Sequence, residues 1–435
     1  MQMKELLKRY MPLFMVKWLR IIYDFIISCF RTIQYTYLSL ICYRRYKSIL
    51  KKLRNKEKIK VAFFAIHSSV WKYDYLYRLM VEHSKFEPII VVCPAVNYGM
   101  DNMLSEMDKC YNMFHSRGYN VVRTYISETH EYLDVKKEIN PDIIFYTNPY
   151  KGLIDDRYYI TNFLHTLTCY VPYSACICSI DSQYKKEMHY LVWRFFVENP
   201  VSYKLACRLM LNCGRNTLPV GYPLMDETLS PNYVPSDVWK HNQKIKIIWA
   251  PHHSFDANCG IHFSNFFEVS DVMVDIAQRY VHDIQIAFKP HPLLYAKLLE
   301  VWGKEKTDTY YNQWATMENT QYEPNEYLDL FMSSDAMIFD SVSFIYEYLF
   351  TRNRSLFIYG KGVDEQLNEF GKEALSCHQL AYSIKDIYVF IESLLKGDPD
   401  PLLTKKERYY QSNILPMNAS TASEAILNEI VNQTK

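Results

Sequence analysis

Histidines with catalytic potential follow two strand-like segments in the second half of the chain. His252 and His253 come directly after the apolar run 244–249. His291 stands between two prolines, just after the run 284–289. An imidazole can move a proton near neutral pH or, when protonated, neutralise an anion. These positions therefore predict an acid–base or anion-binding site.

A third segment ends in Asp340, Ser341 and Ser343, immediately before a helix expected over 344–350. Asp340 or Ser341 can cap this helix, so that unpaired backbone N–H groups and Ser343 face a phosphate. Glu347, one turn further on, can accept hydrogen bonds from ribose hydroxyls. The combination predicts a binding site for a nucleotide.

Tandem histidines also suggest a metal site, but the sequence has no HxH or HExxH pattern and no paired carboxylate nearby. We therefore expect no metal and no other cofactor. The sequence also lacks a GxSxG elbow, a P-loop and a GxGxxG fingerprint. Their absence disfavours the hydrolase, NTPase and dinucleotide-binding classes.

The elements that must position these residues alternate between strands and helices in two series. Short apolar runs ending in polar loops are typical of buried parallel strands. The expected strands are 59–66, 88–93, 120–126, 141–147, 244–249, 284–289, 336–339 and 355–359, and the expected helices are 71–83, 101–118, 266–281, 325–333 and 344–350. The sequence predicts two Rossmann-like, doubly wound α/β domains that face a cleft.

Pro, Asn and Ser in the stretch 230–236 are typical of a linker between the two series. The predicted domains are an N-terminal arm over 1–58, an N-terminal acceptor domain over 59–228, a C-terminal nucleotide-donor domain over 240–405, and closing helices over 406–435. Eleven cysteines without a CxxC pair are expected to be reduced thiols in the cytoplasm.

Charge is distributed unevenly along the chain. Residues 1–60 contain 15 Lys and Arg against three acidic residues, whereas the rest contains 34 basic and 45 acidic residues. Bulky apolar residues such as Trp18, Phe25 and Phe30 are interleaved with the basic ones. This pattern predicts amphipathic helices on an anionic membrane surface, at the cytoplasmic face and peripheral, and disfavours nucleic acid as the partner.

Two other interpretations of the arm stay open. The window 25–43 is long enough to span a bilayer, but Arg31 inside it would cost about 2.5–3.5 kcal/mol. Alternatively, the arm is a helical hairpin packed on the protein itself.

The order of the motifs resembles that of the CDP-glycerol glycerophosphotransferases, which include the teichoic-acid primases and polymerases. The matching segments are Ala250-Pro-His-His253, Lys289-Pro-His-Pro292, and Asp340-Ser-Val-Ser343 followed by Glu347. Gly221-Tyr-Pro-Leu-Met-Asp226 is similar to the family's Gly-x-Pro-x-x-Asp, and the segment 419–431 is similar to its closing Ala-Ser helix. The resemblance covers about residues 215–435.

The resemblance implies a GT-B fold and a CDP-activated donor bound by the C-terminal half. It implies transfer of glycerol phosphate or a related polyol phosphate to a lipid-linked polymer acceptor, in the synthesis of a teichoic-acid-like or capsular polymer. His291 would contact the donor phosphates, with Lys289 as a second positive group. The catalytic base is expected in the N-terminal half. His67 is favoured because it ends the first strand, and His165 is the rival because it lies in the region of the family's His-Gly-Thr motif.

The sequence departs from the family at three places. The Thr-Trp-Arg expected after Ala250-Pro251 is replaced by His252-His253-Ser254, the Asp-x-Ser-Ser motif loses one hydroxyl at Val342, and the His-Gly-Thr motif is not recognisable. Two alternatives therefore remain, a GT-B glycosyltransferase that uses a nucleotide sugar and a catalytically inactive membrane-bound scaffold.

Overall fold

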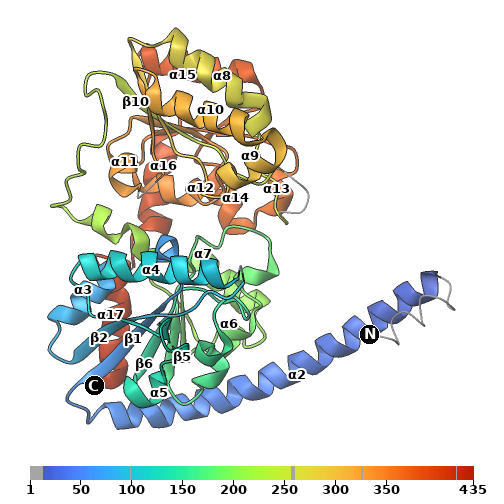
Figure 1. Ribbon diagram of the computed structural model, residues 1–435, viewed down its shortest axis with the longest axis vertical. Coiled ribbons are helices and arrows are strands. Elements are labelled where there is room, and N and C mark those ends of the chain that lie inside the picture. The colour runs from blue at the N-terminus through green and yellow to red at the C-terminus, as the bar shows by residue number, and fades with distance from the viewer. Residues whose placement is uncertain (1–12, 98, 256–259, 325–326, 418) are drawn as a thin grey trace.

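The computed structural model describes residues 13–97, 99–255, 260–324, 327–417 and 419–435. Two α/β domains lie one above the other, and a long helix projects from the lower one (Figure 1). Residues 1–12 of the predicted arm lie outside the described residues. The predicted fold class of two doubly wound parallel sheets is confirmed.

The N-terminal domain contains a seven-stranded parallel sheet in the order β3-β2-β1-β6-β7-β8-β9. Its strands are β1 (Ile59–Ala65), β2 (Phe86–Val92), β3 (Val121–Arg123), β6 (Ile143–Tyr146), β7 (Leu167–Tyr170), β8 (Arg194–Val197) and β9 (Thr217–Pro219). A small hairpin, β4 (Tyr125–Ile126) with β5 (Glu131–Tyr132), lies beside it. The helices are α3 (Asp74–Glu82), α4 (Met100–Ser116), α5 (Val135–Glu138), α6 (Glu187–Leu191) and α7 (Pro200–Leu209).

The C-terminal domain contains a six-stranded parallel sheet in the order β12-β11-β10-β13-β14-β15. Its strands are β10 (Ile245–Ala250), β11 (Ile284–Phe288), β12 (Thr320–Tyr322), β13 (Ala336–Phe339), β14 (Arg354–Ile358) and β15 (Gln379–Ala381). The helices are α8 (Phe266–Arg279), α9 (Leu294–Trp302), α10 (Lys304–Thr316), α11 (Leu328–Met332), α12 (Phe344–Glu347), α13 (Val363–Gln366), α14 (Glu369–Leu375), α15 (Ile384–Leu395) and α16 (Leu403–Tyr409). Central strands such as β11 and β13 are buried throughout because helices cover both faces of the sheet.

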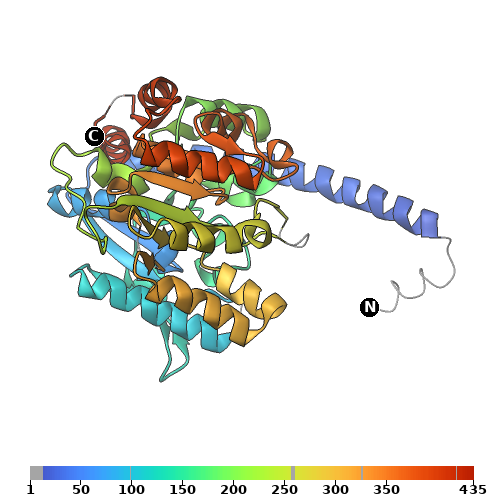
Figure 2. The same cartoon turned by 90° about the horizontal axis from the view of Figure 1, so that it is seen from above.

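The N-terminal helix α2 (Leu13–Leu53) has two parts with different surroundings. Its first part projects away from the domain in both views (Figures 1 and 2). There the side chains of Trp18, Phe25 and Phe30 are 64–68% exposed. The last part packs on the N-terminal domain and buries Cys42 and Tyr46. By length and composition alone, α2 could cross a membrane.

The C-terminal helix α17 (Ala422–Thr434) returns to the N-terminal domain, where it packs on α3 and α2. Its start is bound by the junction between the domains. Asp226, in the 3₁₀-helix η5 (Pro223–Leu229), accepts hydrogen bonds from the backbone N–H groups of Ala422 at 2.8 Å and Ser423 at 2.7 Å. Burial raises the pKa of Asp226 to about 7.

Gly221 precedes η5 with a φ of +109°, and a Cβ there would come within 2.9 Å of the Ala422 Cβ. Only glycine fits both the backbone conformation and this close approach. The Gly-x-Pro-x-x-Asp motif and the closing Ala-Ser helix are therefore two sides of one structural contact.

Replacing Gly221 with alanine should lower the thermal unfolding midpoint more than replacing Gly152. Both glycines have a positive φ, +109° and +82°, so both variants are strained. A Cβ at Gly152 meets nothing within 4 Å, whereas a Cβ at Gly221 overpacks against Ala422 at an additional cost of about 1–3 kcal/mol. Equal unfolding midpoints for G221A and G152A would contradict this account of the junction.

Candidate active site

The carboxyl ends of the two sheets face each other. Loops after β7 of the N-terminal domain are hydrogen-bonded to the C-terminal domain: the Asn368 side chain donates to the Cys176 carbonyl at 2.7 Å, and the Ser179 N–H donates to the Gln366 carbonyl at 2.8 Å. Loops at the carboxyl ends of parallel strands carry the binding residues in open α/β folds. Residues of both domains can therefore contribute to one site.

The structure brings His252, His253 and His291 together at the carboxyl ends of β10 and β11. The ring centres of His253 and His291 are 4.0 Å apart, those of His252 and His253 are 4.4 Å apart, and those of His252 and His291 are 4.8 Å apart. One ring nitrogen from each residue lies within 4.8 Å of the others. The predicted clustering of these residues is therefore observed.

Backbone donors determine which nitrogen carries the proton in two of these rings. The Ser254 N–H donates to Nδ1 of His252 at 3.3 Å, and the Leu293 N–H donates to Nδ1 of His291 at 3.1 Å. Because Nδ1 accepts in both rings, the proton of each neutral imidazole is on Nε2. A metal ligand needs an unprotonated nitrogen, so this arrangement suits a hydrogen-bond acceptor such as an anion better than a cation.

Burial favours the neutral imidazoles of His252 and His291. It lowers the pKa of His291 to about 3, assisted by the nearby His253 and Lys289, and it lowers the pKa of His252 well below its ordinary value. Lys289 is also buried, and desolvation lowers its pKa to about 8. A bound anion would favour the charged forms of all three groups.

Asp340 holds two backbone segments of the site together. Its carboxylate accepts hydrogen bonds from the backbone N–H groups of His252 and Asn265, both at 2.6 Å. It is fully buried, and desolvation raises its pKa to about 7. Both oxygens are thus used to hold the β10 loop and the start of α8, and the predicted contact of Asp340 with a donor stays a prediction.

The turn after Asp340 offers further donors. Among the described residues, no acceptor binds the backbone N–H groups of Ser341, Val342 and Ser343. Ser341 is buried and Ser343 is half-buried. These N–H groups, with the histidines, form a surface suited to phosphate oxygens.

Glu347 of α12 is buried, and its carboxylate is occupied by two tyrosines. Tyr222 of the junction donates to Oε1, and Tyr327 donates to Oε2, both at 2.7 Å. The predicted contact of Glu347 with a ribose stays a prediction.

Two lysines lie beside the tyrosines that bind Glu347. Lys289 lies 5.5 Å from the ring centre of Tyr327, and Lys72 of the N-terminal domain lies 5.2 Å from that of Tyr222. Among the described residues, the buried Nζ of Lys72 has no hydrogen-bond partner, and desolvation lowers its pKa to about 7 although Glu347 and Glu198 oppose this. A bound anion nearby would favour the charged form of Lys72, as it would for Lys289.

His67 follows β1 and forms a dyad with a carboxylate. Its Nδ1 lies 3.0 Å from Oε2 of Glu106 in α4. Partial burial raises the pKa of Glu106, but hydrogen bonds from Lys109 and His67 outweigh it and lower the pKa overall. With Nδ1–H donating to this carboxylate, Nε2 of His67 is left to accept a proton.

His165 is not brought to the site. It precedes β7, and the backbone N–H of Leu167, the first residue of that strand, donates to the carbonyl of Asp142 just before β6. His165 therefore lies at the amino edge of the sheet, opposite to the edge that carries His67, and it is exposed.

Sequence reasoning missed Lys72, Glu106, Glu198 and the two tyrosines on Glu347. Lys72 stands five residues after His67, and Glu198 directly follows β8, so both are close to strand ends. Their position shortly after a strand was the sequence signal that could have identified Lys72 and Glu198 as site residues. Glu106 lies within a helix of ordinary amphipathic pattern, and nothing in the sequence distinguishes it from a solvated residue.

No family model and no curated protein matches the sequence. Solved structures do match in fold. A histidine-to-asparagine variant of the wall teichoic acid polymerase TagF aligns with a TM-score of 0.55 at 14% identity, over 93% of this chain and 98% of that one. A putative UDP-N-acetylglucosamine 2-epimerase from Listeria monocytogenes aligns with a TM-score of 0.54 at 15% identity, over 87% of this chain and 97% of that one. S. aureus MnaA with UDP aligns with a TM-score of 0.52 at 15% identity, over 86% of this chain and 96% of that one.

The fold is GT-B. At these identities the similarity establishes the fold alone, and it covers nearly the full length of each GT-B neighbour.

Replacing Asp340 with asparagine should destabilise the GT-B core, because one amide oxygen cannot accept both backbone N–H groups. A buried donor left unpaired costs about 1–3 kcal/mol. The folded pKa of Asp340 is raised to about 7, so the stability that its protonated form contributes is complete below pH 4 and is lost as the pH rises through 7. The difference in urea midpoint between wild type and D340N should therefore be larger at pH 5 than at pH 8.

Asp335→Asn is the control, at the other end of β13, where an exposed carboxylate accepts one N–H from Lys246 at 2.8 Å. D335N should lower the free energy of unfolding less than D340N does. A D340N variant as stable as D335N would show that Asp340 does not hold the two loops.

Proposed function

We propose that this chain is a transferase of cell-surface polymer synthesis. It would move glycerol phosphate, or a related polyol phosphate, from a CDP-activated donor to a lipid-linked acceptor of a teichoic-acid-like or capsular polymer. One observation carries the proposal. The Nε2–H groups of His252 and His291 lie on the same sheet edge as the available N–H groups of residues 341–343. Neutral and cationic donors arranged in this way suit a diphosphate.

The reaction is a displacement at the phosphorus that carries the polyol. The acceptor hydroxyl oxygen forms a bond to this phosphorus, the bond to the bridging oxygen of the diphosphate breaks, and CMP leaves. His291 and Lys289 stabilise the charge that develops on CMP. Nε2 of His67 takes the proton of the acceptor hydroxyl, and Glu106 stabilises the imidazolium that forms.

Membrane attachment at the cytoplasmic face would bring the enzyme to its acceptor. The exposed apolar side chains of α2 support this part of the proposal, because a soluble domain seldom leaves Trp18, Phe25 and Phe30 in water on one element. We propose that this part of α2 lies in the lipid interface as a peripheral anchor.

Donor identity is tested by isothermal titration calorimetry with CDP-glycerol, CDP and UDP-N-acetylglucosamine. The proposal requires that the cytidine compounds bind more tightly than the uridine compound. Tighter binding of UDP-N-acetylglucosamine would favour a nucleotide-sugar enzyme. Failure of all three to bind would favour an inactive scaffold.

His291→Ala should reduce turnover of CDP-glycerol at least about 100-fold, the loss expected when one preorganised donor to a developing charge is removed. The matched control is His282→Ala, because His282 is exposed and precedes β11, the strand that His291 follows. Turnover of H282A should equal that of the wild type. Wild-type turnover in a folded H291A variant would assign this histidine a structural role only.

Glu106→Gln should lower kcat by about 10- to 100-fold with little change in donor affinity, because a neutral amide stabilises the imidazolium of His67 poorly. Asp108→Asn is the control on the same helix, since the Asp108 carboxylate faces Arg123 at 2.9 Å and not His67. An unchanged kcat for E106Q would exclude the dyad from proton transfer.

A further inference from the structure

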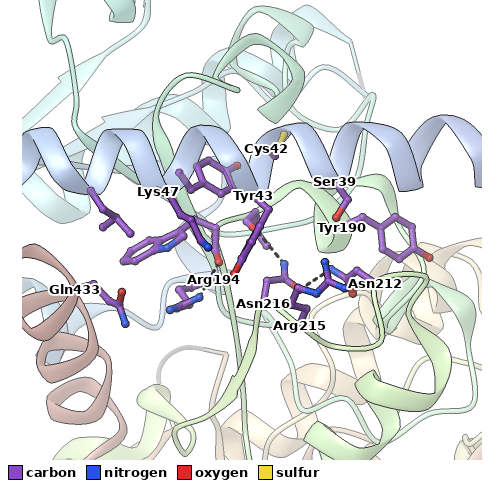
Figure 3. Close-up of a pocket in the computed structure, with 14 residues that line it drawn as sticks. Ser39, Cys42, Tyr43, Lys47, Tyr190, Arg194, Asn212, Arg215, Asn216 and Gln433 are labelled. Carbon is purple, nitrogen blue, oxygen red and sulfur yellow. Dashed lines mark hydrogen bonds between the residues drawn. The ribbon is translucent and has the colours of Figure 1, made fainter.

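A cavity of about 280 Å³ lies between the packed part of α2 and the N-terminal domain (Figure 3). Lys47, Tyr43 and Ser39 of the helix stand on one side of it. Arg194, which begins β8, and the loop before β9 stand on the other. The cavity is therefore at the amino edge of the sheet, whereas the candidate active site is at the carboxyl edge.

The lining of this cavity is positively charged. Its fourteen residues include Lys47, Arg194 and Arg215 and no Asp or Glu. Arg194 is neutralised from outside the lining, since its Nε and Nη2 donate to Glu429 at 2.9 and 2.7 Å. Within the described part of the chain, neither Lys47 nor Arg215 has a carboxylate at ion-pair distance. Two exposed positive charges of the lining thus have no counter-charge at ion-pair distance.

Both of these cations lie over the same aromatic ring. Lys47 Nζ is 4.7 Å and the Arg215 guanidinium 5.8 Å from the ring centre of Tyr43. Cation–π contacts orient the two side chains but do not neutralise them. An anion bound in the cavity would offset both charges and could accept hydrogen bonds from both side chains.

The surroundings of the cavity indicate what kind of molecule would carry the anion. Immediately before Tyr43 the helix carries Tyr37 and Leu40, which are 64% and 48% exposed and begin the apolar part that leaves the domain. The cavity also offers apolar contacts from Leu50 and Trp193. An anion bound here would therefore have apolar surface beside it on both the cavity wall and the helix.

We infer that this cavity binds the phosphate head group of an anionic lipid. The inference deepens the proposed membrane attachment, on which it rests: the apolar part of α2 would enter the lipid interface while Lys47 and Arg215 bind one lipid phosphate beside it. A cavity of this size, near the lower limit of about 300 Å³ for ligand sites, suits a head group better than a nucleotide-activated donor.

The test uses the full chain and a lipid with short chains that stays monomeric in water, so that no membrane surface is present. Calorimetry should detect binding of dihexanoyl phosphatidic acid, and K47Q/R215Q should weaken it at least about tenfold because two charged hydrogen-bond donors are lost. The control variant R44Q/K51Q removes two exposed charges from the same helix outside the cavity lining. It should bind like the wild type.

Several results would overturn the inference. Equal weakening in both double variants would mean general electrostatic attraction. Inorganic phosphate binding as tightly as the short lipid would assign the cavity to a free anion, and equal binding of dihexanoyl phosphatidylcholine would remove the requirement for net negative charge. Absence of any binding would exclude the site.

The anchor is tested separately by sedimentation with phosphatidylcholine vesicles that contain phosphatidic acid. F25E/F30E replaces two side chains that are each 68% exposed, so folding should be unaffected. This variant should lose vesicle binding and keep its affinity for the short lipid. Unchanged vesicle binding by F25E/F30E would contradict the anchor alone, whereas loss of short-lipid binding by F25E/F30E would contradict the assignment of the cavity.

Discussion

The carboxylate of Glu347 accepts hydrogen bonds from Tyr222 of the junction and Tyr327 of the C-terminal domain, and Lys72 of the N-terminal domain lies over the ring of Tyr222. Glu347, Tyr222 and Lys72 are almost completely buried. Tyr327 is partly exposed, but its hydroxyl is buried. Charges removed from water are tolerated only when their partners are in place. The two domains therefore have to meet in one arrangement here, which also positions the start of α12 and the phosphate-facing turn before it.

Most of the fold can be predicted from the sequence, because apolar runs between amphipathic segments are typical of buried parallel strands. The eight predicted runs all contain strands of the two sheets. The strands that escape prediction are short, with two to four residues each: β5, β7, β8, β9, β12 and β15. They contain polar or proline residues, and neighbouring strands rather than their own pattern keep them extended.

The site is predictable to the extent that it depends on strand ends. His252, His253 and His291 meet because parallel strands end at one edge, and the same rule points to His67. The rule cannot tell which polar residues have their hydrogen bonds satisfied inside the protein, and Asp340 and Glu347 are of that kind. His165 was chosen by motif region and not by this rule, and the direction of β7 places it at the amino edge of the sheet.

The return of α17 to the N-terminal domain has a consequence for synthesis on the ribosome. This helix buries Ile426, Ile430 and Thr434, and the Thr434 carbonyl accepts a hydrogen bond from Lys85 at 2.6 Å. Domains usually fold in the order of their translation. Here the N-terminal domain lacks part of its core until residues 422–434 have been translated and have left the exit tunnel. The C-terminal domain, whose sheet is complete at β15, can finish folding first. While the C-terminal domain is being translated, the nascent chain thus presents the apolar part of α2 on a domain that is still unfinished.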